Sequence, residues 1–215
     1  MSNIGAGQRI MLNLVFLPAT EPGDQTYGMV PERIEGYPAA SIHQIHYPTI
    51  VWYNETIRRE AIAQIHSLDV PSVILVGFSK SGLGAWNIAR TIPERISGTI
   101  IFDAPVARDE LHPSGTDPFY ESDASWQEDL PIRTVKNFHA VMPKTHSLVL
   151  ISGESFHEEM CALSEAMSRI GCEHMFLPRP HLKHHWQSGW IEEGLNARWG
   201  KREAVSGKRG GPGFA

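Results

Sequence analysis

One stretch of the sequence, residues 73–90, constrains the fold more than any other. It reads VILVGFSKSGLGAWNIAR: an apolar run, a cluster of small residues, and then a helical pattern. The apolar run has no polar face, as expected for a central strand of a parallel sheet. The stretch therefore predicts a strand that turns directly into a helix, with Ser79 at the corner.

Strand-like and helix-like segments alternate along the rest of the chain. The other predicted strands are Met11–Leu17, Ser41–Tyr47, Gly98–Phe102, Ser147–Ile151 and His174–Leu177. The predicted helices are one capped by Asn54, one over Gly82–Ile92, one lined by Met160, Leu163, Met167 and Ile170, and a closing helix over Trp186–Trp199. This alternation predicts an α/β fold, a mostly parallel sheet with helices on both faces.

The chain of 215 residues is long enough for one domain with a sizeable core, which we expect over residues 1–200. Residues 104–146 are polar, Pro-rich and poorly periodic, and they are predicted to form an irregular insertion or lid. Residues 201–215 are Gly-rich and basic and are predicted to be a disordered tail.

Composition excludes several classes of protein. A formal charge of −5 lacks the basic footprint of a nucleic-acid binder. No apolar stretch approaches the roughly 18 residues of a membrane span. The two cysteines, Cys161 and Cys172, are too few for a disulfide framework and favour a reducing compartment. We therefore expect a cytoplasmic protein that binds neither nucleic acid nor membrane.

The corner at Ser79 has features that suit chemistry. Gly77 and Ser81, two residues before and after it, are small enough to let strand and helix approach each other. The hydroxyl is predicted to lie at the carboxyl edge of the sheet and at a helix N-terminus, where the N–H of Lys80 is the natural donor to a developing oxyanion. A phosphate loop is excluded because no Gly-Lys-Ser/Thr follows four residues after a glycine. The plain alternative is a structural turn that holds a serine.

The run Gly77-Phe78-Ser79-Lys80-Ser81 is a nucleophile elbow with Ser81 in place of the more usual final glycine. At this point the chain resembles the α/β-hydrolase superfamily, in particular its small bacterial esterase-like members. The resemblance covers roughly residues 70–197. It implies that Ser79 is a nucleophile and that a second oxyanion donor follows the first strand, at Ala19 or Thr20.

A serine nucleophile needs a base, and the segment HLKHHWQSGW follows the last predicted strand. The resemblance places a histidine two residues before a tryptophan here, which selects His184. His185 is the alternative, because a shift of one residue in the loop would exchange the two. A metal site at His181, His184 and His185 is disfavoured, since no carboxylate or cysteine stands at ligand spacing. No metal is predicted.

The acid departs from the superfamily pattern. The resemblance implies a carboxylate three residues beyond Gly153, where this chain has Phe156. Asp103, directly after the strand GTIIF, is the favoured replacement, and Glu154 is the alternative. Each also has a structural explanation: Asp103 precedes Ala-Pro in a turn, and Glu154 stands where a carboxylate suits a helix dipole.

The side chain of Lys80 breaks a local rule, because a cation in the first helical turn opposes the helix dipole at a cost of about 0.3–1 kcal/mol. The simplest expectation is that it extends into water. The alternatives are an ion pair with an acidic residue of the insertion and the attraction of an anionic substrate.

These features predict a serine hydrolase that cleaves an ester-like acyl bond through an acyl-enzyme, with a small-molecule acyl substrate and no cofactor. Phe119, Tyr120 and Trp126 of the insertion are expected to cap the acyl pocket. Two alternatives stay open: a hydrolase-fold protein that binds a ligand or partner without turnover, and a cofactor-free perhydrolase or lyase. The sequence leaves the substrate and the oligomeric state open.

Overall fold

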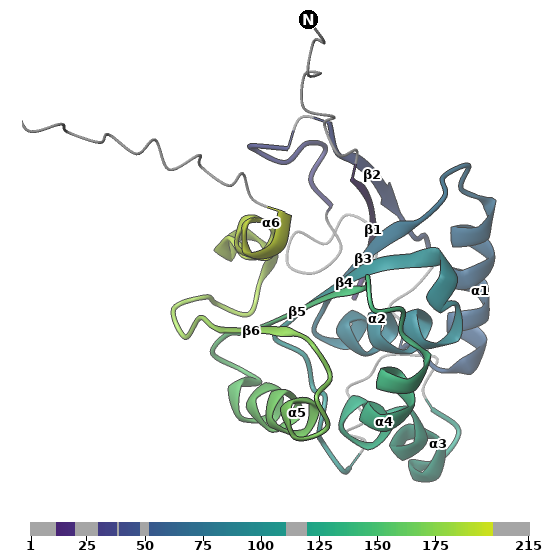
Figure 1. Ribbon diagram of the computed structural model, residues 1–215, viewed down its shortest axis with the longest axis vertical. Helices are drawn as coiled ribbons and strands as arrows, with labels where there is room; N and C mark the ends of the chain where they lie inside the picture. The colour runs from purple at the N-terminus through teal and green to yellow at the C-terminus, as the bar shows by residue number, and fades with distance from the viewer. Residues whose placement is uncertain (1–11, 20–29, 38, 48–51, 111–119, 200–215) are drawn as a thin grey trace, which may run out of the picture.

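The computed structural model describes residues 12–19, 30–37, 39–47, 52–110 and 120–199. Within these residues six strands form one sheet, in the order β2-β1-β3-β4-β5-β6, and every neighbouring pair is parallel (Figure 1). The strands are β1 (Asn13–Leu17), β2 (Ser41–Gln44), β3 (Val73–Phe78), β4 (Ile96–Phe102), β5 (Ser147–Ser152) and β6 (Met175–Pro178). The predicted parallel sheet is confirmed, with β3 near its middle.

The alternation of side chains along each strand builds two apolar layers. In β3, Val73 and Leu75 belong to one core cluster, whereas Ile74, Val76 and Phe78 belong to the other. Successive strand residues point to opposite faces, so a strand that is apolar throughout must be covered on both. This is why the strand at residues 73–78 lies inside the sheet.

Helices cover both faces of the sheet, as predicted. α1 (Glu55–Ser67), α2 (Lys80–Thr91), α4 (Pro131–Val141) and α5 (His157–Arg169) contribute to one core cluster, and α6 (Trp190–Trp199) contributes to the other. Figure 1 shows α6 on one side of the sheet and the four longer helices on the other. The predicted cap of α1 is present, since the side chain of Asn54 accepts from the N–H of Ile57 at 3.1 Å.

The prediction of an irregular segment over residues 104–146 is wrong in its second half, which folds into two helices. α3 (Asp123–Asp129) begins at a capping box in which Ser122 and Ser125 each bond the other's backbone N–H. α4 follows with Pro131 in its first turn, where a missing N–H costs nothing. Capping, rather than a long apolar period, starts both helices.

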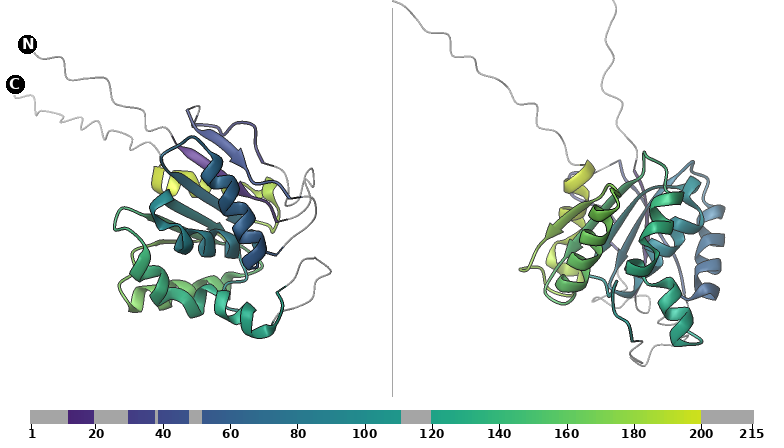
Figure 2. Two further views of the ribbon diagram at one scale, coloured as in Figure 1. Left: turned by 90° about the vertical axis from the view of Figure 1, so that its right-hand side faces the viewer. Right: turned by 60° about the horizontal axis from the view of Figure 1, so that its bottom comes forward.

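α4 is part of the core and packs between α2 and α5 (Figure 2). Its buried residues Pro131, Val135 and Phe138 lie on one face, and the Phe138 ring stacks on Trp86 of α2 with centroids 3.8 Å apart. The sequence prediction missed this face because its three buried residues are spread over a largely polar segment.

The closing helix is also shorter than predicted. A 3₁₀ turn over Trp186–Ser188 is separated from α6 by Gly189, whose φ of 96° favours glycine. The break directs Trp190 into the core, where it is fully buried.

Among the described residues, none of the helices combines the length and apolar character needed to cross a membrane. Cys161 and Cys172 are free thiols.

Candidate active site

Ser79 is held at a strained corner between β3 and α2. Its φ is 55° and its ψ is −124°, and the only other described residue besides glycine with a positive φ is Asp103. Such backbone conformations cost on the order of 1–3 kcal/mol and concentrate at functional sites. A Cβ on Gly77 would lie 2.4 Å from the carbonyl oxygen of Ser81, so only glycine fits there.

Ser81 has a structural role that explains the departure from the usual final glycine. Its buried hydroxyl donates to the carbonyl of Phe78 at 2.9 Å and accepts from the N–H of Phe78 at 2.8 Å. Gly82, one residue later, provides the space that the final glycine of the elbow normally provides. A Cβ on Gly82 would lie 2.6 Å from the Cβ of Ala104.

The register of the sheet brings Ser79 and Asp103 out of neighbouring strands side by side. Phe78, the last residue of β3, pairs with Phe102, the last residue of β4. The N–H of Ser79 donates to the carbonyl of Phe102 at 2.9 Å. Neighbouring strands lie about 4.8 Å apart, so Ser79 and Asp103 lie side by side at the carboxyl edge of the sheet.

Asp103 is fully buried and its carboxylate is fully engaged. Oδ2 accepts from Nδ1 of His184 at 2.8 Å. Backbone N–H groups of the loop after β5 supply the remaining donors: Gly153 (2.9 Å) and Phe156 (3.0 Å) to Oδ1, and Ser155 (3.2 Å) to Oδ2. The loop after β5, where the resemblance implied the acid, thus supplies backbone N–H donors instead. These donors hold Asp103, an acid that follows the neighbouring strand β4.

Two opposing effects set the pKa of Asp103. Burial raises the pKa of the carboxyl, and the hydrogen bonds from His184, Gly153 and Phe156 lower it by more, so the net pKa lies below the ordinary value. The carboxylate is therefore ionised at neutral pH and holds the proton of His184 on Nδ1.

Aromatic rings fix the plane of the His184 imidazole. Its centroid lies 4.7 Å from that of Phe78 and 5.3 Å from that of Phe156. Phe78 directly precedes Ser79, so the imidazole lies over the elbow. With Nδ1 bonded to Asp103, Nε2 is the nitrogen suited to accept a proton.

The alternative acid and base occupy other places. The carboxylate of Glu154 accepts the backbone N–H of His184 at 3.2 Å and the ammonium of Lys183 at 2.6 Å, so it holds the loop rather than the imidazole. Nδ1 of His185 is buried without a hydrogen-bond partner. The structure joins Asp103 to His184 and leaves Glu154 and His185 outside this pair.

The expected oxyanion donors lie around the same corner. Lys80 is the first residue of α2, where backbone N–H groups have no helical partner. Leu17 pairs with Gly77, which puts Ala19, two residues on, level with Ser79. The loop is anchored there, because the Tyr53 hydroxyl donates to the carbonyl of Pro18 at 2.6 Å. Thr20 lies outside the described residues.

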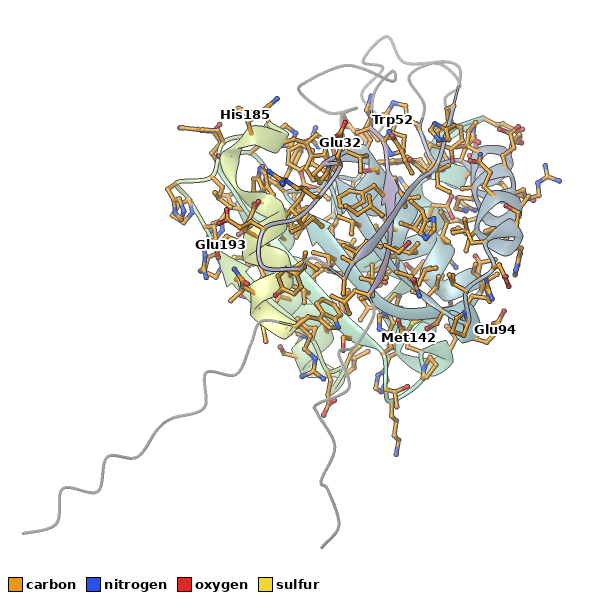
Figure 3. All side chains as sticks on the ribbon, turned by 90° about the horizontal axis from the view of Figure 1, so that it is seen from above. Glu32, Trp52, Glu94, Met142, His185 and Glu193 are labelled. Carbon is orange, nitrogen blue, oxygen red and sulfur yellow. The ribbon has the colours of Figure 1, made fainter. Side chains whose placement is uncertain are left out.

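The side chain of Lys80 does not extend into water, and that expectation is wrong. Its Nζ lies 5.4 Å from the ring centroid of Trp52, and burial lowers the pKa of its ammonium to about 8. Trp52 follows β2, and Figure 3 places it at the same edge of the molecule as His185, opposite Glu94 and Met142. The sequence prediction missed Trp52 because no pattern links residues so far apart.

Two of the predicted pocket residues are buried beneath this edge. The ring centroids of Trp126 and Trp52 lie 5.4 Å apart, and the Tyr120 hydroxyl donates to the backbone carbonyl of Tyr53 at 3.2 Å. Phe119 lies outside the described residues. A role for Tyr120 and Trp126 in an acyl pocket stays a prediction.

Within the part of the chain that the structure describes, no three His, Cys, Asp or Glu side chains are grouped so as to hold a metal ion.

Comparison with solved structures identifies the fold. The chain has the α/β-hydrolase fold, and 226 solved chains match it. MPT51 of Mycobacterium tuberculosis matches with a TM-score of 0.61 at 12% identity, over 87% of each chain. FphF, a fluorophosphonate-binding serine hydrolase of Staphylococcus aureus, matches with a TM-score of 0.57 at 11% identity, over 91% of this chain and 86% of its own.

A lipase-esterase related protein of Clostridium acetobutylicum matches with a TM-score of 0.55 at 10% identity, over 86% of this chain and 93% of its own. No protein-family model matches the sequence, and no curated protein sequence matches it. At these identities the likeness concerns the fold, and the chemistry has to be argued from the residues.

Proposed function

We propose that this protein is a serine hydrolase that cleaves an ester-like acyl bond through an acyl-enzyme intermediate. The observation that carries the proposal is the hydrogen bond between Asp103 and His184 beside the strained elbow at Ser79. A purely structural turn does not require a buried carboxylate that is bonded to a histidine. A serine nucleophile does require this pair, because its proton must be taken by a base that an acid holds in place.

In the proposed reaction, Ser79 Oγ attacks the acyl carbonyl while Nε2 of His184 takes its proton. Asp103 keeps the other imidazole proton on Nδ1 and stabilises the imidazolium that forms. The oxyanion is bonded by the backbone N–H of Lys80 and by one from the loop after β1, at Ala19 or Thr20. His184 then protonates the leaving group, and water, deprotonated by the same imidazole, releases the acid.

Two features support this assignment of roles. The hydroxyl of Ser79 makes no capping hydrogen bond to α2, so its own helix does not engage it. The neighbouring fold relatives include a protein described as a fluorophosphonate-binding serine hydrolase and another described as a lipase-esterase related protein. The proposed substrate is a small acyl ester.

The test is covalent labelling with a fluorophosphonate probe, with the modified peptide mapped by mass spectrometry. We expect the label on Ser79, no labelling of Ser79→Ala, and labelling of His184→Ala slowed by about 10²–10⁴-fold. His185→Ala is the matched control and keeps most of the rate. If the folded wild-type protein takes no label, the proposal is wrong, and a ligand-binding protein without turnover replaces it.

A further inference from the structure

The parallel sheet determines the direction of each backbone N–H along β1. In an extended strand, the N–H and C=O of one residue face one neighbouring strand, and those of the next residue face the other. The carbonyl of Leu12 accepts from the N–H of Ser41 at 2.8 Å, at the start of β2. The carbonyl of Phe16 accepts from the N–H of Ile45 at 3.0 Å, directly after β2. Even-numbered residues along β1 therefore face β2, and odd-numbered residues face β3.

The peptide between Pro18 and Ala19 continues this alternation beyond the end of β1. The carbonyl of Pro18 accepts from the hydroxyl of Tyr53, which lies in the segment after β2, at 2.6 Å. Because a trans peptide is planar, the N–H of Ala19 in the same peptide points the opposite way. That direction leads towards the end of β3, where Ser79 lies. The hydrogen bond from Tyr53 thus sets the direction of the Ala19 N–H.

The N–H of Ala19 has no acceptor among the described residues, although Ala19 is buried. Buried backbone N–H groups without a partner are rare, because the hydrogen bond to water is lost and not replaced. An unpaired donor that points to the nucleophile is the arrangement that stabilises a developing oxyanion.

Tyr53 is itself held in place on several sides. Its side chain is fully buried, and burial raises the pKa of its hydroxyl well above the ordinary value, so the hydroxyl remains a donor at neutral pH. Its ring packs on Gly84 of α2, where a Cβ would lie 2.4 Å from the ring carbons. Glycine inside a helix is destabilising relative to alanine, and this contact explains why Gly84 is present. The backbone carbonyl of Tyr53 accepts from Arg58 at 3.0 Å and from Tyr120 at 3.2 Å.

We propose that Tyr53 is a positioning residue of the oxyanion site, whose hydroxyl aligns the Pro18–Ala19 peptide so that the N–H of Ala19 bonds the oxyanion. This inference rests on the proposed function, and it selects Ala19 over Thr20 as the second donor. Tyr53 acts through the peptide that lies between its hydroxyl and the oxyanion. The same hydrogen bond polarises that peptide, which strengthens its N–H as a donor.

The experiment compares two probes that differ in one atom, a fluorophosphonate and its thiono analogue with sulfur in place of the phosphoryl oxygen. With either probe, Oγ of Ser79 bonds to phosphorus, fluoride leaves, and His184 takes the proton of the hydroxyl. The phosphoryl oxygen gains negative charge and accepts from the oxyanion donors, whereas sulfur is a weak acceptor. The readout is the labelling rate of the oxygen probe divided by that of the sulfur probe, a ratio that cancels effects on Ser79 and His184.

Tyr53→Phe removes the hydroxyl and keeps the ring. We expect the ratio to fall by about fivefold or more, which is less than the cost of about 10²–10³-fold for deleting an oxyanion donor. Tyr47→Phe is the matched control, because Tyr47 is also buried and its ring centroid lies 5.7 Å from that of Tyr53. Its hydroxyl donates to the carbonyl of Ile57 rather than to the loop after β1, so the ratio should not change.

An unchanged ratio in Tyr53→Phe, with Ser79 of the wild type labelled, overturns this inference alone. An equal fall of the ratio in Tyr53→Phe and Tyr47→Phe overturns it as well, because loosened packing rather than the hydrogen bond to Pro18 would then be the cause. If the folded wild type reacts with neither probe, the proposed function is wrong, and this inference with it. Circular dichroism checks that each variant is folded.

Discussion

Asp103 and His184 stand 81 positions apart in the chain and are joined by a 2.8 Å hydrogen bond between Oδ2 and Nδ1. Among the described residues, the other donors to the carboxylate are the backbone N–H groups of Gly153, Ser155 and Phe156. In the superfamily pattern the loop after β5 carries the acid itself. In this protein the same loop orients Asp103, which follows β4.

Asp103→Asn tests that relationship. The amide presents an N–H₂ group either to the imidazole or to the backbone donors, so His184 loses its fixed tautomer. We expect fluorophosphonate labelling of Ser79 to slow by about 10³–10⁴-fold. The melting curve, followed by circular dichroism, should show a folded protein that is less stable by about 1–3 kcal/mol, because a buried donor is left unpaired.

Glu154→Gln is the comparison for the alternative acid. The amide oxygen can still accept the N–H of His184, and only the exposed ion pair with Lys183 is lost. The labelling rate should therefore fall by about fivefold or less, since exposed ion pairs contribute little. A larger loss here than in Asp103→Asn would reverse the assignment of the acid.

Ser81→Ala removes the hydroxyl that bonds both polar groups of the Phe78 backbone. The free energy of unfolding should fall by about 1–3 kcal/mol, because these buried groups lose their partner. Ser81→Gly should lose a similar amount, although glycine is the more usual residue in an elbow. Urea denaturation measures both, with Ser67→Ala, at an exposed helical hydroxyl, as the control. A Ser81→Gly variant as stable as the wild type would contradict this account.

Lys80→Met should stabilise the protein at neutral pH. The folded-state pKa of about 8 lies below the ordinary value of 10.5, so the folded chain carries the charge at a cost below pH 8. As pH rises from 8 to 10.5, the folded state releases the proton first and the wild type gains stability. The variant should be more stable by about 1 kcal/mol at pH 7, a value reduced for the partial exposure of the side chain, and level with the wild type near pH 10.5.

Thermal melts across this pH range check the prediction, with Lys144→Met at an exposed position as the control. A stability difference that does not depend on pH would mean that packing, rather than the buried charge, separates the two proteins.

His146→Gln should make the protein less sensitive to acid. Burial lowers the pKa of His146 from 6.5 to about 4, and its Nε2 lies 3.0 Å from the hydroxyl of Thr99. Between pH 6.5 and 4 the unfolded chain binds a proton at this imidazole and the folded chain does not. Stability that is fully present above pH 6.5 is therefore lost as the pH falls towards 4. We expect the wild type to lose about 2 kcal/mol more than the variant over this range.

Denaturant midpoints at pH 7 and pH 4.5 measure this difference, with the exposed His139→Gln as the control. Parallel loss of stability in the wild type and His146→Gln would show that other groups dominate the acid response.

The sequence by itself determined the parts of the molecule that depend on local pattern. The apolar run at residues 73–76, followed by Gly77 and Ser79, predicts a buried strand and a strained corner, and both are present. Alternation of such segments predicts the parallel sheet. Local pattern failed at residues 123–141, because capping and three spaced apolar contacts, rather than a long period, specify those helices.

Only the tertiary structure decided what surrounds the corner. The pairing of Phe78 with Phe102 sets Asp103 beside Ser79, and the position of the loop after β6 sets His184 against Asp103 and the ring of Phe78. The three donors of residues 153–156 are backbone groups, so their side chains carry no signal of that role. The contact of Lys80 with Trp52 joins residues brought together by strand order alone. The local sequence pattern determines where helices and strands form. The order and register of the parallel strands determine which residues meet at the ends of those strands.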